Sequence, residues 1–342
     1  MTIRLCIALA VVATCAAAAP AGAVIGGEPL DNQDVPWFTS VSGCGGTLVA
    51  PDRLLTAAHC VGGIAPADMA PTVVNGQTRT IEHVAMHPGY RHKNGDNYLD
   101  DVAIVQLDQP VTGVAPVQLG DSSENARIIG FGNIFAPGTG HSEADMLKGG
   151  LHQATLRQVS DADCAKVYKT NTPGSGEHFN AARMRCAVDV DGKQPLNSGC
   201  FGDSGGALVV GTDQAPVQLG VTSWGGDRCG ADHSPSVFAD TVRYRDFILD
   251  PTPTWGPTEH TDVTIKSSKR SLRCSVAERE PGTKLTYVWK HRGHHRPLEV
   301  IGTGSTHKVT KSDAGTRLSC FAYASNDGGE ILAGSDSVMV AS

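Results

Sequence analysis

Residues 199–207 read Gly-Cys-Phe-Gly-Asp-Ser-Gly-Gly-Ala, and the interpretation of the whole chain starts from this stretch. It places the hydroxyl of Ser204 between glycines and directly after the carboxylate of Asp203. Glycines allow backbone conformations that a Cβ would penalise, and they leave amide N–H groups free to face a substrate carbonyl. Acyl transfer needs an attacking oxygen beside such donors. Alone, the stretch also fits an ordinary turn, so the rest of the chain must supply a base and an acid.

The composition indicates a globular, loop-rich protein. A length of 342 residues fits two or three domains. The net charge of -7 gives no reason to expect nucleic acid or an anionic membrane as partner, and 5% aromatic residues provide few stacking platforms for single strands. We therefore expect no nucleic-acid partner and no membrane partner.

Residues 1–23 are predicted to form a signal peptide. Arg4 is the only charge before an apolar run from Leu5 to Ala19, and residues 21–23 (Ala-Gly-Ala) match a small-x-small cleavage motif. The run is short for a membrane span, and no stop-transfer charges follow it. We expect the leader to be removed and the mature protein to be secreted.

Export makes disulfides the expected state of the cysteines. Of the 10 cysteines, Cys6 and Cys15 fall in the leader, which leaves an even number in an oxidising compartment. The chain has no CxxC or CxxH pair, so we do not expect the cysteines to form a zinc site. We expect no metal among the predicted site residues and no cofactor. The remaining cysteines are Cys44, Cys60, Cys164, Cys186, Cys200, Cys229, Cys274 and Cys320.

Two upstream segments supply a base and an acid. Residues 56–60 read Thr-Ala-Ala-His-Cys, and an imidazole such as that of His59 titrates near neutrality. Asp100 and Asp101 directly precede an alternating apolar run and compete for the role of the acid. Short apolar runs separated by Gly, Pro, Asn and Asp recur up to about residue 238, a pattern typical of antiparallel β structure. Only residues 241–250 have a helical pattern.

Residues 24–250 together resemble a chymotrypsin/trypsin-like serine endopeptidase domain. The resemblance implies an all-β fold with two six-stranded antiparallel β-barrels and a C-terminal helix. Phe131 stands where the family usually has tryptophan. The matching motifs, in the family's order and at its approximate spacings, are Val-Ile-Gly-Gly (24–27), Thr-Ala-Ala-His-Cys (56–60), Asp-Val-Ala-Ile (101–104), Gly-Phe-Gly (130–132), Gly-Asp-Ser-Gly-Gly (202–206) and Ser-Trp-Gly (223–225).

The resemblance implies a role for each residue of a Ser-His-Asp triad. Ser204 would be the nucleophile, and His59 would be the base that takes its proton. Asp101 would be the acid, since in the family the acid directly precedes the apolar strand, and Asp100 would be a solvated loop charge. The backbone N–H groups of Gly202 and Ser204 would form the oxyanion hole.

The resemblance also implies an activation ion pair and a set of disulfides. The freed amine of Val24 would pair with Asp203, and cleavage after Ala23 would leave no activation peptide, so export itself would create the active N-terminus. The implied disulfides are Cys44–Cys60, Cys164–Cys186, Cys200–Cys229 and Cys274–Cys320.

The specificity pocket implied by the resemblance carries no charge at its base. Ser198 would lie there beside Gly199, so a substrate Arg or Lys would bury its charge unpaired. We therefore expect cleavage after neutral or apolar P1 residues. Asp227 and Asp232 lie nearby in sequence, and if they reached the pocket they would restore a preference for Arg or Lys. The other substrate-binding residues would be Ser223, Trp224, Gly225 and Ser236.

Beyond residue 250 the pattern changes. Residues 251–261 form a Pro-rich linker, and alternating apolar residues then recur around Cys274, Trp289 and Cys320. The segment 262–342 resembles a small immunoglobulin-like β-sandwich, with another disulfide-linked β module as the alternative. The basic run 290–296 is best explained as a solvated hairpin turn, although a polyanion patch or a histidine metal site stays open.

Three functional classes follow from these features. The first is an active secreted serine endopeptidase, a monomer acting on protein or peptide substrates, with a protein inhibitor as a further candidate partner. The second is a protease-fold binding protein without catalysis, which the intact triad disfavours. The third places the function in the C-terminal domain, which would bind a surface or a protein partner.

Overall fold

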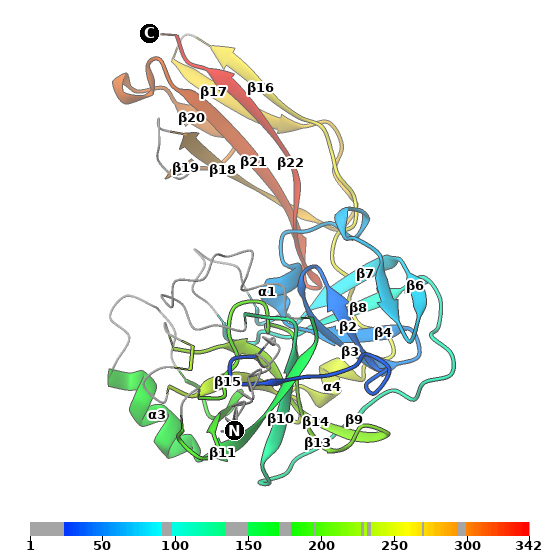
Figure 1. The fold of residues 1–342 in the computed structure, drawn as a ribbon. Helices are drawn as coiled ribbons and strands as arrows, with labels where there is room; N and C mark the ends of the chain where they lie inside the picture. The colour runs from blue at the N-terminus through cyan, green and yellow to red at the C-terminus, as the bar shows by residue number, and fades with distance from the viewer. Residues whose placement is uncertain are drawn as a thin grey trace, which may run out of the picture.

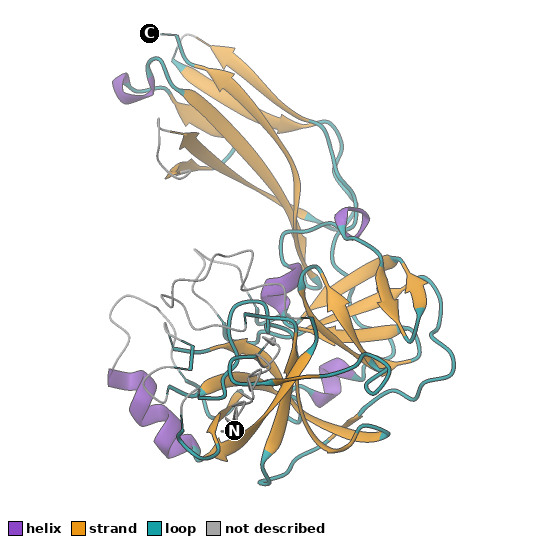
Figure 2. Cartoon of the chain, viewed as in Figure 1, coloured by secondary structure: helices purple, strands orange, loops and turns teal. Residues whose placement is uncertain are grey.

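The computed structural model describes residues 24–90, 98–133, 150–170, 179–193, 196–226, 229–230, 234–268, 270–292 and 299–341. These residues are mainly β-strands, in two barrel-like halves followed by a separate pair of sheets (Figures 1 and 2). No helix in the described part of the chain is both long and apolar enough to cross a membrane. The predicted all-β fold is thus confirmed.

The second half of the protease-like segment is a closed antiparallel barrel. Strand pairing runs in the order β11-β10-β13-β14-β15-β12, and β12 pairs back to β11. Alternate residues such as Ala154 and Leu156 point into its core. Its strands and the edge strands joined to it are β1 (Glu28–Pro29), β9 (Gln118–Leu119), β10 (Ala126–Gly130), β11 (His152–Val159), β12 (Met184–Asp189), β13 (Ala207–Thr212), β14 (Ala215–Trp224) and β15 (Ser236–Asp240).

The first half is a five-stranded sheet with a hairpin beside it. The sheet order is β2-β3-β4-β8-β7, and the hairpin β5–β6 contacts β2 through a 2.7 Å hydrogen bond between the hydroxyls of Thr39 and Thr72. The strands are β2 (Phe38–Val41), β3 (Cys44–Ala50), β4 (Arg53–Thr56), β5 (Thr72–Val74), β6 (Gln77–Arg79), β7 (Ile81–Met86) and β8 (Ala103–Leu107).

Helices are few, and one of them contradicts the sequence-based prediction. We expected a helical pattern only in residues 241–250, and the structure has the short α4 (Arg245–Ile248) there. It also has α3 (Asp161–Thr170), which begins where the Ser160 hydroxyl accepts a hydrogen bond from the Asp163 amide at 3.2 Å. Its buried residues Cys164 and Tyr168 lie one helical turn apart. Two buried positions are too few to give a recognisable helical repeat of apolar residues in the sequence. The others are α1 (Ala58–Val61) and the 3₁₀ turns η1 (Pro66–Asp68) and η2 (Lys311–Asp313).

The C-terminal strands form a three-stranded and a four-stranded sheet that share one core. The Cys274–Cys320 disulfide joins the two sheets, and Trp289 is fully buried against it. The three-stranded sheet has the order β16-β17-β20 and the other β19-β18-β21-β22. Their bounds are β16 (Val263–Ser268), β17 (Ser271–Val276), β18 (Lys284–Arg292), β19 (Glu299–Thr303), β20 (Thr306–Lys308), β21 (Arg317–Asn326) and β22 (Gly329–Met339).

The segment predicted as a linker has no regular secondary structure and packs against the first half. Trp255 stacks on His83 with ring centroids 5.5 Å apart, and Arg53 lies 5.8 Å over the same indole. Of the basic run, Lys290 and His291 lie on β18, whereas residues 293–298 lie outside the described residues.

Candidate active site

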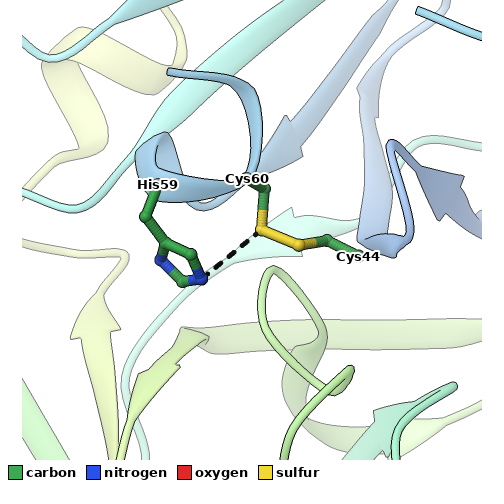
Figure 3. Close-up of side chains that lie close together, drawn as sticks. All are labelled: Cys44, His59 and Cys60. Atoms are coloured by element: carbon green, nitrogen blue, oxygen red, sulfur yellow. Dashed lines mark hydrogen bonds between the residues drawn. A yellow bond between two sulfur atoms is a disulfide. The ribbon is translucent and has the colours of Figure 1, made fainter. Parts of the chain in front are cut away.

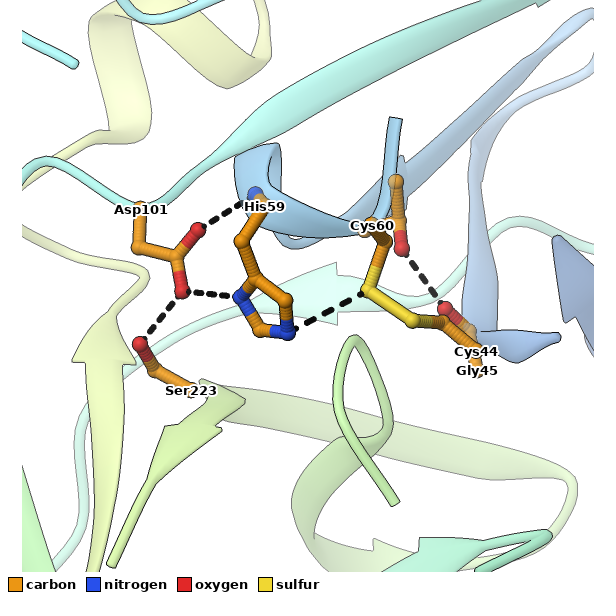
Figure 4. Close-up of a disulfide and its surroundings, with 7 residues drawn as sticks. Cys44, Gly45, His59, Cys60, Asp101 and Ser223 are labelled. Carbon is orange, nitrogen blue, oxygen red and sulfur yellow. Dashed lines mark hydrogen bonds and ion pairs between the residues drawn. A yellow bond between two sulfur atoms is a disulfide. The ribbon is translucent and has the colours of Figure 1, made fainter. Parts of the chain in front are cut away.

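The sheet of the first half positions the imidazole of His59. β4 ends at Thr56, and the chain turns directly into α1, which carries His59 at the junction of the two halves. Asp101 lies just before β8 and is fully buried. Its Oδ2 is 2.7 Å from His59 Nδ1, and its Oδ1 accepts a hydrogen bond from the His59 backbone N–H at 2.9 Å (Figure 4). Ser223 donates a third hydrogen bond to the carboxylate at 2.5 Å.

These contacts define the protonation chemistry of His59. Burial lowers the pKa of the imidazole, but the charge of Asp101 and the hydrogen bond to it outweigh burial and raise the pKa above 6.5. With Nδ1–H directed at Asp101, the lone pair of Nε2 stays available to accept a proton. The contacts to Asp101 therefore fix the orientation of the ring and leave Nε2 able to accept a proton.

The prediction that Asp100 is a solvated loop charge is wrong, because its side chain is buried. It is 6% exposed and has a left-handed backbone with φ of +58°. Its carboxylate accepts a hydrogen bond from Tyr244 Oη at 3.1 Å and forms an ion pair with Arg183 at 3.2 Å. Both partners come from distant parts of the chain, so the local sequence could not indicate that this carboxylate is buried. Asp101, not Asp100, contacts His59.

Ser204 and His59 line the same cavity, as a nucleophile and its base must. Among the described hydrogen bonds none joins Ser204 Oγ to His59 Nε2. Such bonds are often long in substrate-free enzymes and shorten when substrate binds.

Two backbone N–H groups beside Ser204 are available as donors. Within the described residues, the hydrogen bonds of this loop use the amides of Asp203, Gly205 and Gly206 but not those of Gly202 and Ser204. Gly202 has a φ of +94°, and a Cβ there would lie 2.8 Å from the Cα of Gly132. A glycine is therefore required for the loop to keep its two free donors in place.

Asp203 is a fully buried carboxylate held by backbone donors. It accepts hydrogen bonds at 2.8 Å from the amides of Gly132 and Cys200. Burial nevertheless dominates and raises its pKa to about 7. A cation beside it would reverse this penalty.

Val24 is also buried, in the core of the second barrel. Ile25 exchanges two backbone hydrogen bonds with Ser198, at 3.0 and 3.1 Å, which places the N-terminal segment along the nucleophile loop. In the intact chain Val24 has a φ of +61°, which is unfavourable for a β-branched residue. The predicted ion pair between a Val24 amine and Asp203 involves a group that this uncleaved chain does not contain.

The cavity shared by His59 and Ser204 has a volume of about 180 Å³, and no Asp, Glu, Lys or Arg occurs among the described residues that line it. Ser198 lines it, and its Oγ donates to Gly199 O at 2.9 Å. The Gly199 amide donates to Ser236 Oγ at 3.1 Å. A Cβ on Gly225 would meet nothing closer than 3.7 Å, so this wall is open. Every predicted substrate-binding residue lines the cavity: Ser198, Gly199, Ser223, Trp224, Gly225 and Ser236. Asp227 and Asp232 lie outside the described residues.

Comparison with known proteins identifies the family. The family model described as Trypsin matches residues 24–248. The chain belongs to the trypsin family. It is 32% identical over 249 residues to a trypsin of Saccharopolyspora erythraea, covering 66% of this chain and 97% of that protein. It is 31% identical over 242 residues to the vitellin-degrading protease of Bombyx mori, covering 66% of this chain and 84% of that protein.

A solved structure agrees with this assignment. Neuropsin, a serine protease expressed in the limbic system of mouse brain, superimposes with a TM-score of 0.54 at 26% identity, over 66% of this chain and 98% of neuropsin. This trypsin-family chain is therefore a serine protease, and proteins are its class of substrate. The strands after residue 260 lie outside the family match.

Two aromatic residues that line the cavity of this serine protease were not assigned to the site by the sequence analysis. Tyr98 packs edge-on against His59 with ring centroids 5.4 Å apart, and Phe201 is 64% exposed at the cavity rim. Phe201 directly follows the half-cystine Cys200 and lies three residues before Ser204. This closeness to Ser204 in the sequence was the only feature that could have indicated its place in the cavity. Neither residue carries a charge, so both add to the apolar character of the site.

The cysteines are paired as the resemblance implied: Cys44–Cys60, Cys164–Cys186, Cys200–Cys229 and Cys274–Cys320. Cys44, Cys60 and His59 cluster closely enough to suggest a metal site, with Cys60 Sγ 3.7 Å from His59 Nε2 (Figure 3). Both sulfurs are in a disulfide, however, and a metal needs the thiolate form. The disulfide instead ties α1 to β3 and limits the movement of His59.

Proposed function

We propose that this protein is a secreted serine endopeptidase that hydrolyses peptide bonds through a Ser204–His59–Asp101 triad and an acyl-enzyme. The observation that carries the proposal is the His59–Asp101 contact of 2.7 Å at the edge of the cavity that Ser204 also lines. The unused N–H groups of Gly202 and Ser204 support it, since they are the donors that a tetrahedral oxyanion requires.

The proposed reaction has two halves. His59 Nε2 takes the Ser204 proton while Oγ attacks the scissile carbonyl, and the N–H groups of Gly202 and Ser204 stabilise the oxyanion. The imidazolium of His59 then protonates the leaving amine. Asp101 stabilises the positive charge of the imidazolium for as long as it exists. In the second half, water loses a proton to His59 and attacks the acyl-enzyme, and the imidazolium returns that proton to Ser204 Oγ as the ester bond breaks and the carboxylic acid leaves.

Removal of residues 1–23 would complete the site. Cleavage before Val24 relieves the left-handed backbone at that residue and creates an amine that can pair with Asp203. N-terminal sequencing of fully active secreted protein should give Val24 as the first residue. A start at Pro20 would contradict activation by leader removal alone.

The uncharged cavity supports cleavage after neutral or apolar P1 residues, because an Arg or Lys side chain would find no counter-charge among the described residues that line it. Cleavage after Arg or Lys is the alternative. A panel of peptide amides that differ only at P1 decides between them, and a strong preference for Arg over Phe and Leu would overturn our choice.

We also propose that the protein is a monomer composed of a signal peptide (1–23), a protease domain (24–250), a Pro-rich linker (251–261) and an immunoglobulin-like domain (262–342). The inter-sheet disulfide Cys274–Cys320 and the buried Trp289 support the last assignment.

Labelling of the mature protein with an organophosphate tests the triad. We expect stoichiometric labelling at Ser204, none in Ser204→Ala, and loss of peptide hydrolysis in parallel. The matched control is Ser122→Ala, which removes a half-buried loop hydroxyl that accepts a hydrogen bond from the Glu124 amide and does not line the cavity. Folded protein that neither labels nor hydrolyses peptides would favour the catalytically silent binding protein.

A further inference from the structure

The tip of the β21–β22 hairpin, residues 326–332, reaches the protease half beside α1 (Figure 1). The Gly63 amide donates to Glu330 O at 2.9 Å, and the Leu332 amide donates to Gly63 O at 3.0 Å. Gly63 lies just after α1, and the Gly62 amide closes that helix on Ala58 O. The C-terminal strands therefore hold, through backbone hydrogen bonds, the segment that continues from the helix of His59.

The same hairpin tip also holds the segment that leads to Asp101. Gly328 O accepts a hydrogen bond from the Met86 amide at 2.7 Å, at the end of β7. The next amide, that of His87, donates to Val102 O at 2.9 Å. Since Val102 directly follows Asp101, the hairpin contacts the segment after His59 directly and is linked to the segment of Asp101 through Met86 and His87.

Side chains also pack across the contact between the hairpin tip and the protease half. Ala65 from the protease half is buried in one cluster with Ala324, Ile331 and Ala333. His260 and Asp68 form an ion pair across the junction at 2.7 Å.

Gly328 lies against the connecting segment with no space for a side chain. A Cβ there would be 2.1 Å from Thr254 O and 2.4 Å from the carbonyl carbon of Trp255. Asn326 fastens the tip further, because its Nδ2 donates to Trp255 O at 3.0 Å and its Oδ1 accepts from the Gly328 amide at 2.8 Å.

We propose that the β21–β22 hairpin tip is a positioning element of the active site, which fixes the helix of His59 relative to the segment of Asp101. A domain that only bound substrates on a tether would not touch the catalytic segments. The inference rests on the proposed function, since it concerns the geometry of the triad. Its consequence is that hydrolysis of a substrate too short to reach the C-terminal domain still depends on that domain.

The test compares Gly328→Ala with Gly302→Ala in the full mature chain. Gly302 is in the same domain, and a Cβ there would meet only His307 Nδ1 at an ordinary 3.5 Å. With a short peptide amide, we expect Gly328→Ala to lower kcat by roughly 10- to 100-fold at nearly unchanged KM, because misplacement by about 1 Å has effects of this size. Gly302→Ala should match the unmodified protein. Asn326→Ala, a milder change, should lie between them.

Hydrogen exchange is measured on the same samples. The Leu332 amide reports the junction, and the amides of Gly62 and His87 report the two catalytic segments. Loss of protection at all three supports the inference. Loss at Leu332 alone, with kcat unchanged, would overturn it, and so would full protection of Leu332 in both Gly328→Ala and Asn326→Ala.

The exchange measurement also separates the positioning role from the proposed function. If the unmodified protein hydrolyses nothing and resists organophosphates, the proposed function fails. The exchange of Gly62 and His87 then still decides the inference, since loss of protection supports positioning by the hairpin and retained protection contradicts it.

Discussion

Two carboxylates among the described residues of the protease half, Asp101 and Asp203, are completely buried, and they differ in whether an ionisable base lies beside them. Asp101 lies against a titratable imidazole and accepts hydrogen bonds from His59 and Ser223. Asp203 accepts two backbone hydrogen bonds but contacts no cation among the described residues, and its pKa rises to about 7. The two hydrogen bonds to Asp203 therefore do not offset the cost of burying its charge, and in the proposed function the Val24 amine would supply the counter-charge.

Replacement of the first carboxylate should have the largest effect. Asp101→Asn leaves the shape intact but removes the acceptor that holds Nδ1–H, so we expect kcat for peptide hydrolysis to fall roughly 10⁴-fold, the size of effect established for this replacement in the general Ser-His-Asp mechanism. The control is Asp100→Asn, which alters the contacts to Arg183, Tyr244 and His87 and leaves the His59–Asp101 contact in place. Equal losses in the two variants would contradict the assignment of the acid.

Replacement of Asp203 should change the free energy of unfolding in opposite directions in the cleaved and the uncleaved chain. In protein that starts at Val24, Asp203→Asn leaves a buried amine unpaired, and we expect a loss of about 3–5 kcal/mol in the free energy of unfolding. In protein that retains its leader, the same change removes an unpaired buried carboxylate and should stabilise the fold at about pH 8. Denaturant titration of both forms measures this. The same sign in both would refute the activation pair.

The pH dependence of stability distinguishes the two forms without mutation. The pKa of Asp203 is about 7 in the folded, uncleaved chain against 3.8 for an ordinary Asp, so the unfolded state releases its proton at lower pH. The uncleaved chain should therefore lose stability as pH rises from about 4 to 7, by about 4 kcal/mol at 1.36 kcal/mol per unit. Freeing the Val24 amine, or introducing Asp203→Asn, should remove this slope. A slope that persists in both would assign the titration to another group.

The smallest change concerns the third donor to Asp101. Ser223→Ala removes the 2.5 Å hydrogen bond to Asp101. Because that hydrogen bond no longer stabilises the carboxylate charge, the charge attracts the imidazolium more strongly, and the pKa of His59 should rise further. The acid limb of the kcat/KM profile should move to higher pH, with a loss of about 1–3 kcal/mol in stability. Thr222→Val, a neighbour whose hydroxyl makes no described hydrogen bond, is the control. An unmoved limb would show that Ser223 has no electrostatic role.

Local motifs were enough to find the chemical groups but not all of their surroundings. His59, Asp101 and Ser204 each lie in a short, distinctive stretch, and the cysteine pairs followed from the same resemblance. The burial of Asp100 escaped prediction because Tyr244 is 144 positions away. α3 escaped because it depends on the Ser160 cap and two buried residues instead of a long apolar period.

The amino-acid sequence by itself determined which residues can do chemistry, because glycine-flanked and cysteine-flanked motifs restrict the backbone wherever they occur. It also determined the β-rich class through alternation of apolar residues. Only the tertiary structure decided that Asp100 is buried against Tyr244 and Arg183, that Asp203 is buried without a counter-charge among the described residues, and that Gly63 pairs with β22. Each of these depends on atoms brought together from distant positions, and burial and charge pairing are properties of that assembly.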